Sequence, residues 1–427
     1  MRIKQYITLG SIAALVFLLP FLLRFYQNRT LPGDISYYYF SAFPHLFPFS
    51  FAAQWLVNSS LTLVFLALVS FIIGGWDVSS EEQFFMMIFL IMSPATLYLS
   101  SQPTPYLYAL LCIAASLALV TTHFSYLMVV PFAGLIFFDW TALVCGVAIV
   151  SAYTLFLNKK KFLFVPLATL LLFIIVHFLT PLSFIFAQLA ERSFLIELFS
   201  DLGGAFGLSL FIFILSIIGF ALTWKKKKEY IPLYVLSFLL FLLFVWSRAA
   251  LLFFYPILSI LAAHAFTYFW RREWTLPFVH ILTIAVLSYG VLFSTLAYGT
   301  TLVYDPPSPE LMTSVQWLHN HPFYNHDVVL SLPRNGFFND YGSTAFVTPF
   351  SSVENVNITH TIFNSRDLKK TAGLLQSNNI SIILIDDAMK RSLWNTDDDG
   401  LLFLFRTSGS FVKVYDTTGI EMWKFKD

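Results

Sequence analysis

The chain has 427 residues, of which 58% are hydrophobic and only 11% are charged, and its mean hydropathy is +0.74. About a quarter of the residues of a soluble domain are charged, so this composition excludes a disordered chain and an ordinary cytosolic enzyme and indicates a polytopic membrane protein. The net charge of +1 indicates no nucleic-acid partner. Two cysteines in apolar runs exclude a disulfide framework and a cysteine-based metal site.

The charged residues divide the chain near Thr300. Residues 1–300 contain 15 Lys and Arg and 10 Asp and Glu, whereas residues 301–427 contain 10 and 14 in less than half that length. We therefore predict a transmembrane domain at 1–300 and a separate domain, soluble and slightly acidic, at 301–427. A spanning helix needs about 20 mainly apolar residues. The apolar runs predict about eleven spans, at residues 5–24, 52–75, 84–100, 104–121, 124–138, 140–157, 162–179, 206–224, 230–247, 249–269 and 275–299.

Basic residues indicate the orientation of these spans. With eleven spans, one side of the membrane carries 11 of the 15 basic residues of the first domain, namely Arg2, Lys4, Lys159–Lys161, Lys225–Lys228, Arg271 and Arg272. The positive-inside rule makes that side cytoplasmic. We therefore expect a multi-pass protein with a cytoplasmic N-terminus and an extracytoplasmic or lumenal C-terminal domain. The first apolar run has no cleavage site before Arg24, so we expect it to be a retained span.

On this topology, two long loops and several helix ends face the outer side. The first loop covers about 25–51, and the second covers about 180–205 and is semi-apolar, which suits a segment lying along the membrane interface. The polar and aromatic residues that this topology places at the outer surface include Asp34, Tyr37, Tyr38, Gln102, Glu191, Arg192 and Arg248.

Two motifs of the first domain resemble those of a known family. The segment Leu31-Pro32-Gly33-Asp34-Ile35-Ser36-Tyr37-Tyr38 is similar to the first-loop motif of the GT-C glycosyltransferases, integral membrane enzymes that take sugar from polyprenyl-phosphate-linked donors. The run from Met92 to Tyr106, which contains Ser93-Pro94, resembles the joint between two spans that usually reaches an acidic residue in that family. Here Ser101 or Gln102 occupies the place of that acid. The resemblance implies a GT-C-like helical fold.

A third motif lies in the C-terminal domain. The segment Phe338-Asn339-Asp340-Tyr341-Gly342 resembles the Trp-Trp-Asp-Tyr-Gly box with which oligosaccharyltransferase catalytic subunits recognise the acceptor sequon. The last three residues are kept and both tryptophans are lost, which argues against sequon recognition.

Strand and helix patterns alternate in the same domain and predict a small α/β or α+β fold. The expected helices cover 308–320 and 368–376. The expected strands cover 328–332, 380–385, 411–415 and 420–425, of which the last two form a hairpin.

The resemblance implies a site at the outer membrane surface, where a lipid-held head group meets an acceptor in water. Asp34 is the expected catalytic carboxylate, since it can take the acceptor proton and can bind a divalent cation, Mg²⁺ or Mn²⁺. Arg248 and Arg192 are expected to bind the donor phosphate, because a guanidinium matches phosphate oxygens bidentately. The expected substrate contacts are Tyr37, Tyr38, Gln102, Glu191, Asp340 and Tyr341.

Each of these residues also has a purely structural interpretation. Asp34 follows Pro-Gly and suits a turn or a helix N-cap. Arg248 suits an arginine that reaches from an apolar helix to the interface. Other structural roles are an ion pair for Arg192 with Glu191, an aromatic belt for the tyrosines, and turn positions for Gln102 and Asp340.

Three classes of function follow from these patterns. The favoured one is a glycosyltransferase that uses a polyprenyl-phosphate sugar and acts on a glycan, lipid or protein acceptor at the outer or lumenal face; transfer of an oligosaccharide to protein is an alternative within it. The missing second acid leaves a non-catalytic, GT-C-like scaffold that binds lipid or a partner. A transporter would require internal repeats and charges near mid-membrane, of which the sequence shows no clear repeat and almost no such charge.

Overall fold

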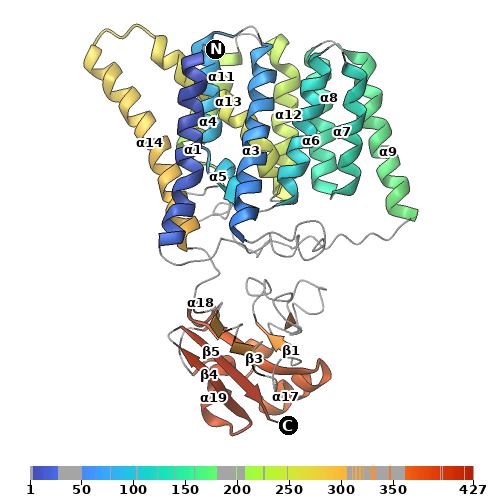
Figure 1. Cartoon of the computed structure of the whole chain (residues 1–427), viewed down its shortest axis with the longest axis vertical. Coiled ribbons are helices and arrows are strands. Elements are labelled where there is room, and N and C mark those ends of the chain that lie inside the picture. The colour runs from blue at the N-terminus through green and yellow to red at the C-terminus, as the bar shows by residue number, and fades with distance from the viewer. Residues whose placement is uncertain are drawn as a thin grey trace. The chain divides into compact units, whose positions relative to one another are not determined.

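The computed structural model of the chain divides into two compact units, each with its own hydrophobic core (Figure 1). The helical unit comprises Met1–Leu23 and Phe49–Val303, and the sheet unit comprises Arg24–Pro48 and Tyr304–Asp427. The structure describes residues 3–26, 51–76, 78–101, 104–122, 124–138, 140–157, 159–179, 199, 207–224, 227–247, 249–304, 310, 313–314, 317–318, 321, 328–331, 346–347, 361–394, 396, 398–417 and 419–426.

Helices lie at each of the eleven apolar runs that the sequence contains. The run at 84–100 forms two helices instead of one, and the run at 124–138 forms a short helix between two 3-10 turns. The helices are α1 (Ile3–Tyr26), α3 (Phe51–Gly74), α4 (Ser80–Ile91), α5 (Pro94–Ser101), α6 (Pro105–Thr121), α7 (Val129–Ala133), α8 (Trp140–Phe156), α9 (Phe164–Leu179), α11 (Leu210–Thr223), α12 (Lys227–Trp246), α13 (Ala250–Arg271) and α14 (Pro277–Tyr304).

Helix length separates these elements into two groups. Within the described residues, α1, α3, α13 and α14 are long and apolar enough to cross a membrane, and α4 with α5 makes a fifth span if this bent pair is counted as one. The other apolar helical stretches, which include Ser125–Phe137 around α7 and Tyr230–Trp246 of α12, have 10–17 residues, fewer than the roughly 20 that a bilayer core requires of a straight helix. The helices are those of a multi-pass membrane protein, while the number eleven and the orientation of the termini stay predictions.

Small residues allow α11 to approach its neighbours closely. A Cβ atom on Gly219 of α11 would lie 2.0 Å from the carbonyl oxygen of Leu261 in α13, and one on Gly290 of α14 would lie 2.3 Å from the ring of Phe211. Helix packing in lipid depends on such small residues, because no hydrophobic force acts between apolar helices there. The backbone of α13 and the ring of Phe211 therefore occupy space that any larger side chain would need.

The sheet unit contains a mixed five-stranded sheet with the order β2-β1-β3-β5-β4. β1 pairs in parallel with β2 and β3, whereas β5 pairs antiparallel with β3 and β4. Its strands are β1 (Val328–Leu330), β2 (Phe346–Val347), β3 (Ile380–Asp386), β4 (Phe411–Thr417) and β5 (Ile420–Phe425), and its helices include α17 (Leu368–Ser377), α18 (Asp387–Leu393) and α19 (Gly400–Thr407).

The local predictions for this unit agree with the elements found. The predicted strands correspond to β1, β3, β4 and β5, and the predicted helix at 368–376 corresponds to α17. Of the predicted helix at 308–320, the structure describes only a few residues. β2, α18 and α19 were not predicted. The extracytoplasmic location of the unit stays a prediction.

The first residue of α19 requires glycine. Gly400 has a φ of +50°, and a Cβ atom there would lie 2.3 Å from the carbonyl oxygen of Phe363. The same carbonyl accepts a hydrogen bond of 2.9 Å from the indole N–H of Trp394. Positive φ and a close backbone approach each favour glycine, so this position couples the start of α19 to the core of the unit.

Candidate functional site

The residues predicted for the site, Asp34, Tyr37, Tyr38, Gln102, Glu191, Arg192, Arg248, Asp340 and Tyr341, lie outside the described residues. The structure does describe helices that flank three of them in the chain. α3 begins at Phe51, after the loop with Asp34, and α5 ends at Ser101, directly before Gln102. α13 begins at Ala250, two residues after Arg248. The structure therefore describes helix ends that lie near three of the predicted residues in the chain.

The first half of α3 contacts the end of α5. The Ser59 hydroxyl of α3 donates a hydrogen bond of 3.2 Å to the carbonyl oxygen of Ser100. The hydroxyls of Ser100 and Ser101 both donate to the carbonyl of Leu97, at 2.9 and 2.8 Å. These bonds satisfy polar groups in the last turn of α5 and hold that turn against α3 (Figure 1).

The beginning of α13 contacts the beginning of α6. Thr104 caps α6, since its hydroxyl oxygen accepts a hydrogen bond of 3.4 Å from the backbone N–H of Tyr106. The ring of Tyr106 meets the ring of Phe253 in α13 edge to face, with 6.0 Å between the centroids. In the chain, Gln102 therefore lies between α5, which contacts α3, and α6, which contacts α13.

We name this region the polar end of the helical unit and define it by Asn58, Ser59, Thr62, Ser100, Ser101 and Thr104. All six side chains are buried, and none of them is charged. Asn58 is fully buried, and within the described part of the chain neither its amide nitrogen nor its amide oxygen has a hydrogen-bond partner. Buried polar groups are nearly always hydrogen-bonded, so Asn58 is a further candidate site residue, and the sequence analysis did not identify it. The sequence feature that could have identified Asn58 is the presence of an amide side chain inside the apolar run at 52–75.

The joint that carries Ser93-Pro94 is a bent pair of helices. α4 and α5 meet at an angle of 57°, and Pro94 takes the first position of α5, where no backbone donor is needed. The Thr96 hydroxyl donates to the carbonyl of Leu90 at 2.5 Å, and the Thr295 hydroxyl of α14 donates to the carbonyl of Met92 at 2.6 Å. Side-chain hydroxyls therefore replace two of the backbone hydrogen bonds that the bend removes.

Two charged pairs join the beginning of α4 to the second half of α13, away from the polar end. Nδ1 of His264 lies 2.7 Å from a carboxylate oxygen of Glu82, whose side chain is only 12% exposed. Arg271 pairs with Glu81 at 3.0 Å and also hydrogen-bonds Ser79. His264 of α13 is thus bonded to the neighbouring helix α4. In α13 (Ala250–Arg271), His264 follows Phe253 by about 17 Å of helix and Arg271 follows it by about 27 Å, so both pairs lie away from the polar end.

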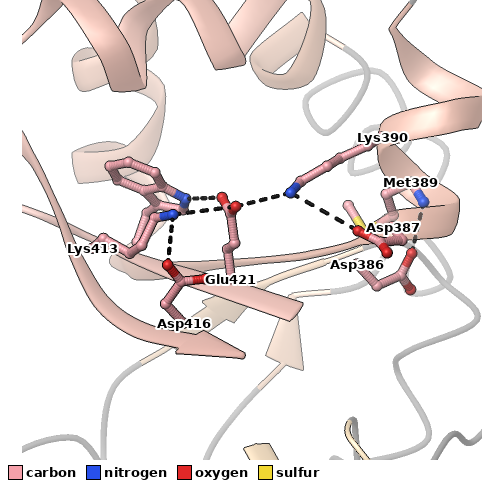
Figure 2. A network of polar contacts seen from close by, with 8 residues as sticks. Asp386, Asp387, Met389, Lys390, Lys413, Asp416 and Glu421 are labelled. Carbon is pink, nitrogen blue, oxygen red and sulfur yellow. Dashed lines mark hydrogen bonds and ion pairs between the residues drawn. The ribbon is translucent and has the colours of Figure 1, made fainter. Parts of the chain in front are cut away.

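The sheet unit contains a second polar cluster, centred on Glu421 (Figure 2). Glu421 lies 2.8 Å from Lys390 and 3.2 Å from Lys413, and it accepts a hydrogen bond of 3.0 Å from the Trp423 indole. Burial acts to raise the pKa of Glu421, but the bonds from Lys390, Trp423 and Lys413 outweigh it and hold this pKa below its usual value.

The pKa of Lys413 is shifted in the opposite direction, upward. Burial acts to lower its pKa, but hydrogen bonds with Asp416 and Glu421 raise it above the usual lysine value. Each charge in the cluster has an opposite charge beside it, which is the pattern of a structural ion-pair network. Among the described residues, no three His, Cys, Asp or Glu side chains are grouped so as to hold a metal ion.

No family model and no curated protein matches this sequence. Solved structures similar to the chain include the oligosaccharyltransferase AglB from the archaeon Archaeoglobus fulgidus in complex with an inhibitory peptide and dolichol-phosphate; it is 12% identical with a TM-score of 0.38, and the match covers 90% of this chain and 58% of that one. The same enzyme tethered to an acceptor peptide with an NVT sequon is 13% identical, with a TM-score of 0.36 and coverage of 98% and 63%.

The chain thus spans about three fifths of the length of these archaeal enzymes. Oligosaccharyltransferases are also the enzymes that the sequence motifs resemble. Because the identities and TM-scores are low, the function proposed below is argued from the residues of this chain.

Proposed function

We propose that this chain is a GT-C-type glycosyltransferase that takes sugar from a polyprenyl-phosphate-linked donor at the extracytoplasmic or lumenal membrane surface. The observation that supports the proposal is that α3 contacts α5, and α6 contacts α13, at the polar end of the helical unit. The chain segments next to these helices carry an acid, Asp34, an amide, Gln102, and a guanidinium, Arg248. These are the groups that glycosyl transfer from a lipid phosphate requires.

The proposed chemistry follows from the charges that develop during transfer. The anomeric carbon becomes positively charged while the leaving phosphate gains negative charge. Asp34 takes the proton of the acceptor, which makes the acceptor oxygen or nitrogen a better nucleophile. Arg248, with Arg192, binds the leaving phosphate through paired N–H groups. Tyr37, Tyr38, Gln102 and Glu191 are proposed to bind the sugar and head group.

A divalent cation, Mg²⁺ or Mn²⁺, is proposed on Asp34 because a carboxylate is a preferred ligand of such hard cations. Bound there, it would supply Lewis-acid stabilisation of the phosphate charge. The argument for a cation is that Asp34 supplies a carboxylate ligand.

Transfer to a protein acceptor is the second candidate. The observation that favours it is the Asp340-Tyr341-Gly342 sequence in the sheet unit. The loss of both tryptophans from that box makes a single-sugar transfer to a glycan or lipid the first choice.

The decisive experiment measures consumption of lipid-linked donor. Membranes that contain equal amounts of the wild type, Asp34→Asn or Glu81→Gln are incubated with a panel of polyprenyl-phosphate sugars and an acceptor extract, with and without Mg²⁺ or Mn²⁺, and are analysed by mass spectrometry. We expect the wild type and Glu81→Gln to consume one donor equally, because Glu81 lies at the opposite helix ends. Asp34→Asn should be slower by roughly 10²–10⁴-fold, the usual contribution of a general base.

Two further outcomes separate the alternatives. If the wild type and Asp34→Asn turn over donor at the same background rate across the panel, the chain is a non-catalytic scaffold and the proposal is wrong. If sugar appears on peptide from the extract, and Asp340→Asn abolishes this transfer but not the hydrolysis of donor, the protein acceptor is correct.

A further inference from the structure

The turn between α11 and α12 and the turn between α13 and α14 lie at the same end of the helical unit. Directly before α11, the Ser209 hydroxyl donates a hydrogen bond of 2.8 Å to the Ser294 hydroxyl of α14. Two residues further on, the ring of Phe211 lies against Gly290. These contacts move toward the beginning of α14 as α11 advances, so the two helices are antiparallel. The end of α11 and the beginning of α14 therefore lie at one end of the unit, where α1 also begins (Figure 1). We name this region the basic end and define it by Lys227, Arg271 and Arg272.

The two neighbouring arginines of the basic end differ in their partners. The Arg271 guanidinium pairs with Glu81 at 3.0 Å and also hydrogen-bonds Ser79, so its charge is offset within the protein. The Arg272 side chain is exposed, and so is that of Lys227. Within the part of the chain that the structure describes, neither of these two cations has a carboxylate partner. Both rest on aromatic rings instead.

The Arg272 guanidinium lies over two aromatic rings. Its Cζ atom is 5.6 Å from the ring centroid of Trp274 and 6.0 Å from that of Tyr268. The Trp274 ring is itself held in place, since its indole N–H donates a hydrogen bond of 3.2 Å to the carbonyl of Phe269 and its face stacks on His280 at 5.9 Å. A cation is attracted to the face of an aromatic ring, so these contacts hold the charge of Arg272 at a fixed place.

The Lys227 ammonium has a similar support. Its Nζ atom lies 5.6 Å from the ring centroid of Trp224. Trp224 stacks on Phe220 with 6.3 Å between centroids and lies 5.5 Å from the ring of Tyr234. The Trp224 side chain is exposed, and exposed tryptophans at the ends of apolar helices lie at the level of the lipid head groups. The cation that rests on this ring is therefore held at the same level.

The two cations keep donors for a ligand from the membrane. A guanidinium that lies on a ring face directs its N–H groups outward in its own plane, and these groups match two oxygens of a phosphate. Phospholipid phosphates are the anions present at head-group level, and basic residues beside apolar helices are attracted to leaflets that contain anionic lipids. A zwitterionic head group carries its own cation, so an anionic head group is the better partner.

We propose that the basic end binds anionic phospholipids, with Arg272 and Lys227 each holding a head-group phosphate. Arg271 takes no part, because Glu81 and Ser79 already engage its guanidinium. The inference does not depend on the proposed function, which concerns the polar end at the opposite ends of the helices.

Native mass spectrometry of the full chain in detergent tests the proposal, with phosphatidylglycerol and phosphatidylcholine of the same acyl chains as probes at about 0.15 M salt. We expect the wild type to bind phosphatidylglycerol severalfold more tightly. Arg272→Gln should weaken this binding about fivefold, the contribution of one basic residue near an anionic surface. Arg271→Gln makes the same charge change one residue away and should weaken it less than twofold. Equal affinities of the wild type for the two lipids, or equal losses in the two variants, would overturn the proposal.

Two tryptophan variants test the aromatic support without changing any charge. Trp274→Leu removes the ring under Arg272, so we expect severalfold weaker binding of phosphatidylglycerol. Trp270→Leu is the matched control, since this exposed tryptophan contacts the rings of Phe266 and Phe85, and it should bind like the wild type. Equal binding by the two variants would contradict a role for the ring. Inorganic phosphate at the same concentration should not displace the lipid; displacement would overturn the assignment to a membrane lipid.

Discussion

Replacing Gly219 by alanine tests the packing of α11 against α13. The added Cβ would lie 2.0 Å from the carbonyl oxygen of Leu261 and 2.7 Å from its carbonyl carbon. Both atoms belong to the backbone of a helix, so no side chain can rotate away. The two helices must separate by a distance on the order of 1 Å to reach ordinary van der Waals separation.

The magnitude follows from the dispersion energy that this separation removes. A gap of about 0.5–1 Å forfeits a quarter to a half of the attraction between two atoms, and every atom pair along the helix crossing is affected. Overpacking of cores typically costs about 1–3 kcal/mol. We therefore expect a loss of about 2 kcal/mol, which corresponds to a Tm lower by about 4–8 °C at the shift per kcal/mol usual for units of roughly 150–250 residues.

The assay is thermal unfolding of detergent-solubilised protein at one fixed scan rate, followed by loss of the monodisperse peak in size-exclusion chromatography. The matched control is Gly10→Ala in α1, where nothing lies within 4 Å of the new Cβ and where alanine favours the helix. We expect the control to melt with the wild type or slightly above it. If Gly219→Ala melts together with Gly10→Ala, the close crossing of α11 and α13 is wrong.

Three further predictions concern the sheet unit and the charged helix ends. Gly400→Ala should destabilise the sheet unit and expose it to proteases, because of its positive φ and the nearby Phe363 carbonyl, whereas Gly373→Ala in α17, with nothing within 4 Å of the new Cβ, should gain about 0.5–1 kcal/mol. The lowered pKa of Glu421 gives a folded-state value below the unfolded one, so its stabilisation is present above the unfolded pKa and is lost as pH falls through the folded one. Hydrogen exchange of β5 in the whole chain, corrected for intrinsic rates, should show this acid loss of protection in the wild type and a smaller one in Glu421→Gln. Glu82→Ala should lower Tm, since it leaves a half-buried histidine without its partner, whereas Glu81→Ala removes an exposed pair and should change stability by about 0.5 kcal/mol or less.

Each of these predictions has an outcome that contradicts it. Equal protease resistance of Gly400→Ala and Gly373→Ala would show that the start of α19 is not constrained as described. An unchanged acid response in Glu421→Gln would remove that carboxylate from the acid stability of β5. Equal Tm values for Glu82→Ala and Glu81→Ala would mean that the pair with His264 contributes no more than a surface ion pair.

Local sequence patterns predicted most of the elements, but not their lengths or joints. The apolar run at 84–100 reads as one span by hydropathy, and the structure divides it at Ser93-Pro94, since proline supplies no donor to the preceding turn. The run at 230–247 did predict α12, and the two strand patterns at 411–415 and 420–425 did predict the hairpin of β4 and β5. α18 and α19 were missed because their seven or eight residues are too short for a clear period.

The candidate site was predictable only as a set of chain positions. Asp34, Gln102 and Arg248 stand out because polar residues are rare beside apolar runs, and that signal is local. Asn58 carries no such signal, because a single amide inside an apolar run is compatible with many satisfied arrangements. Its full burial, and the absence of a hydrogen-bond partner for its amide within the described residues, appear only in the structure.

The sequence by itself determined where helices and strands form, because hydropathy, proline and turn residues act over a few neighbouring positions. It also determined the membrane class of the protein, since no soluble core could bury so large an apolar fraction. Only the tertiary structure decided that α5 packs against α3 and α6 against α13, that α4 and α5 meet at 57°, and that Glu82 pairs with His264. These features join residues far apart in the chain, so they depend on how whole helices pack.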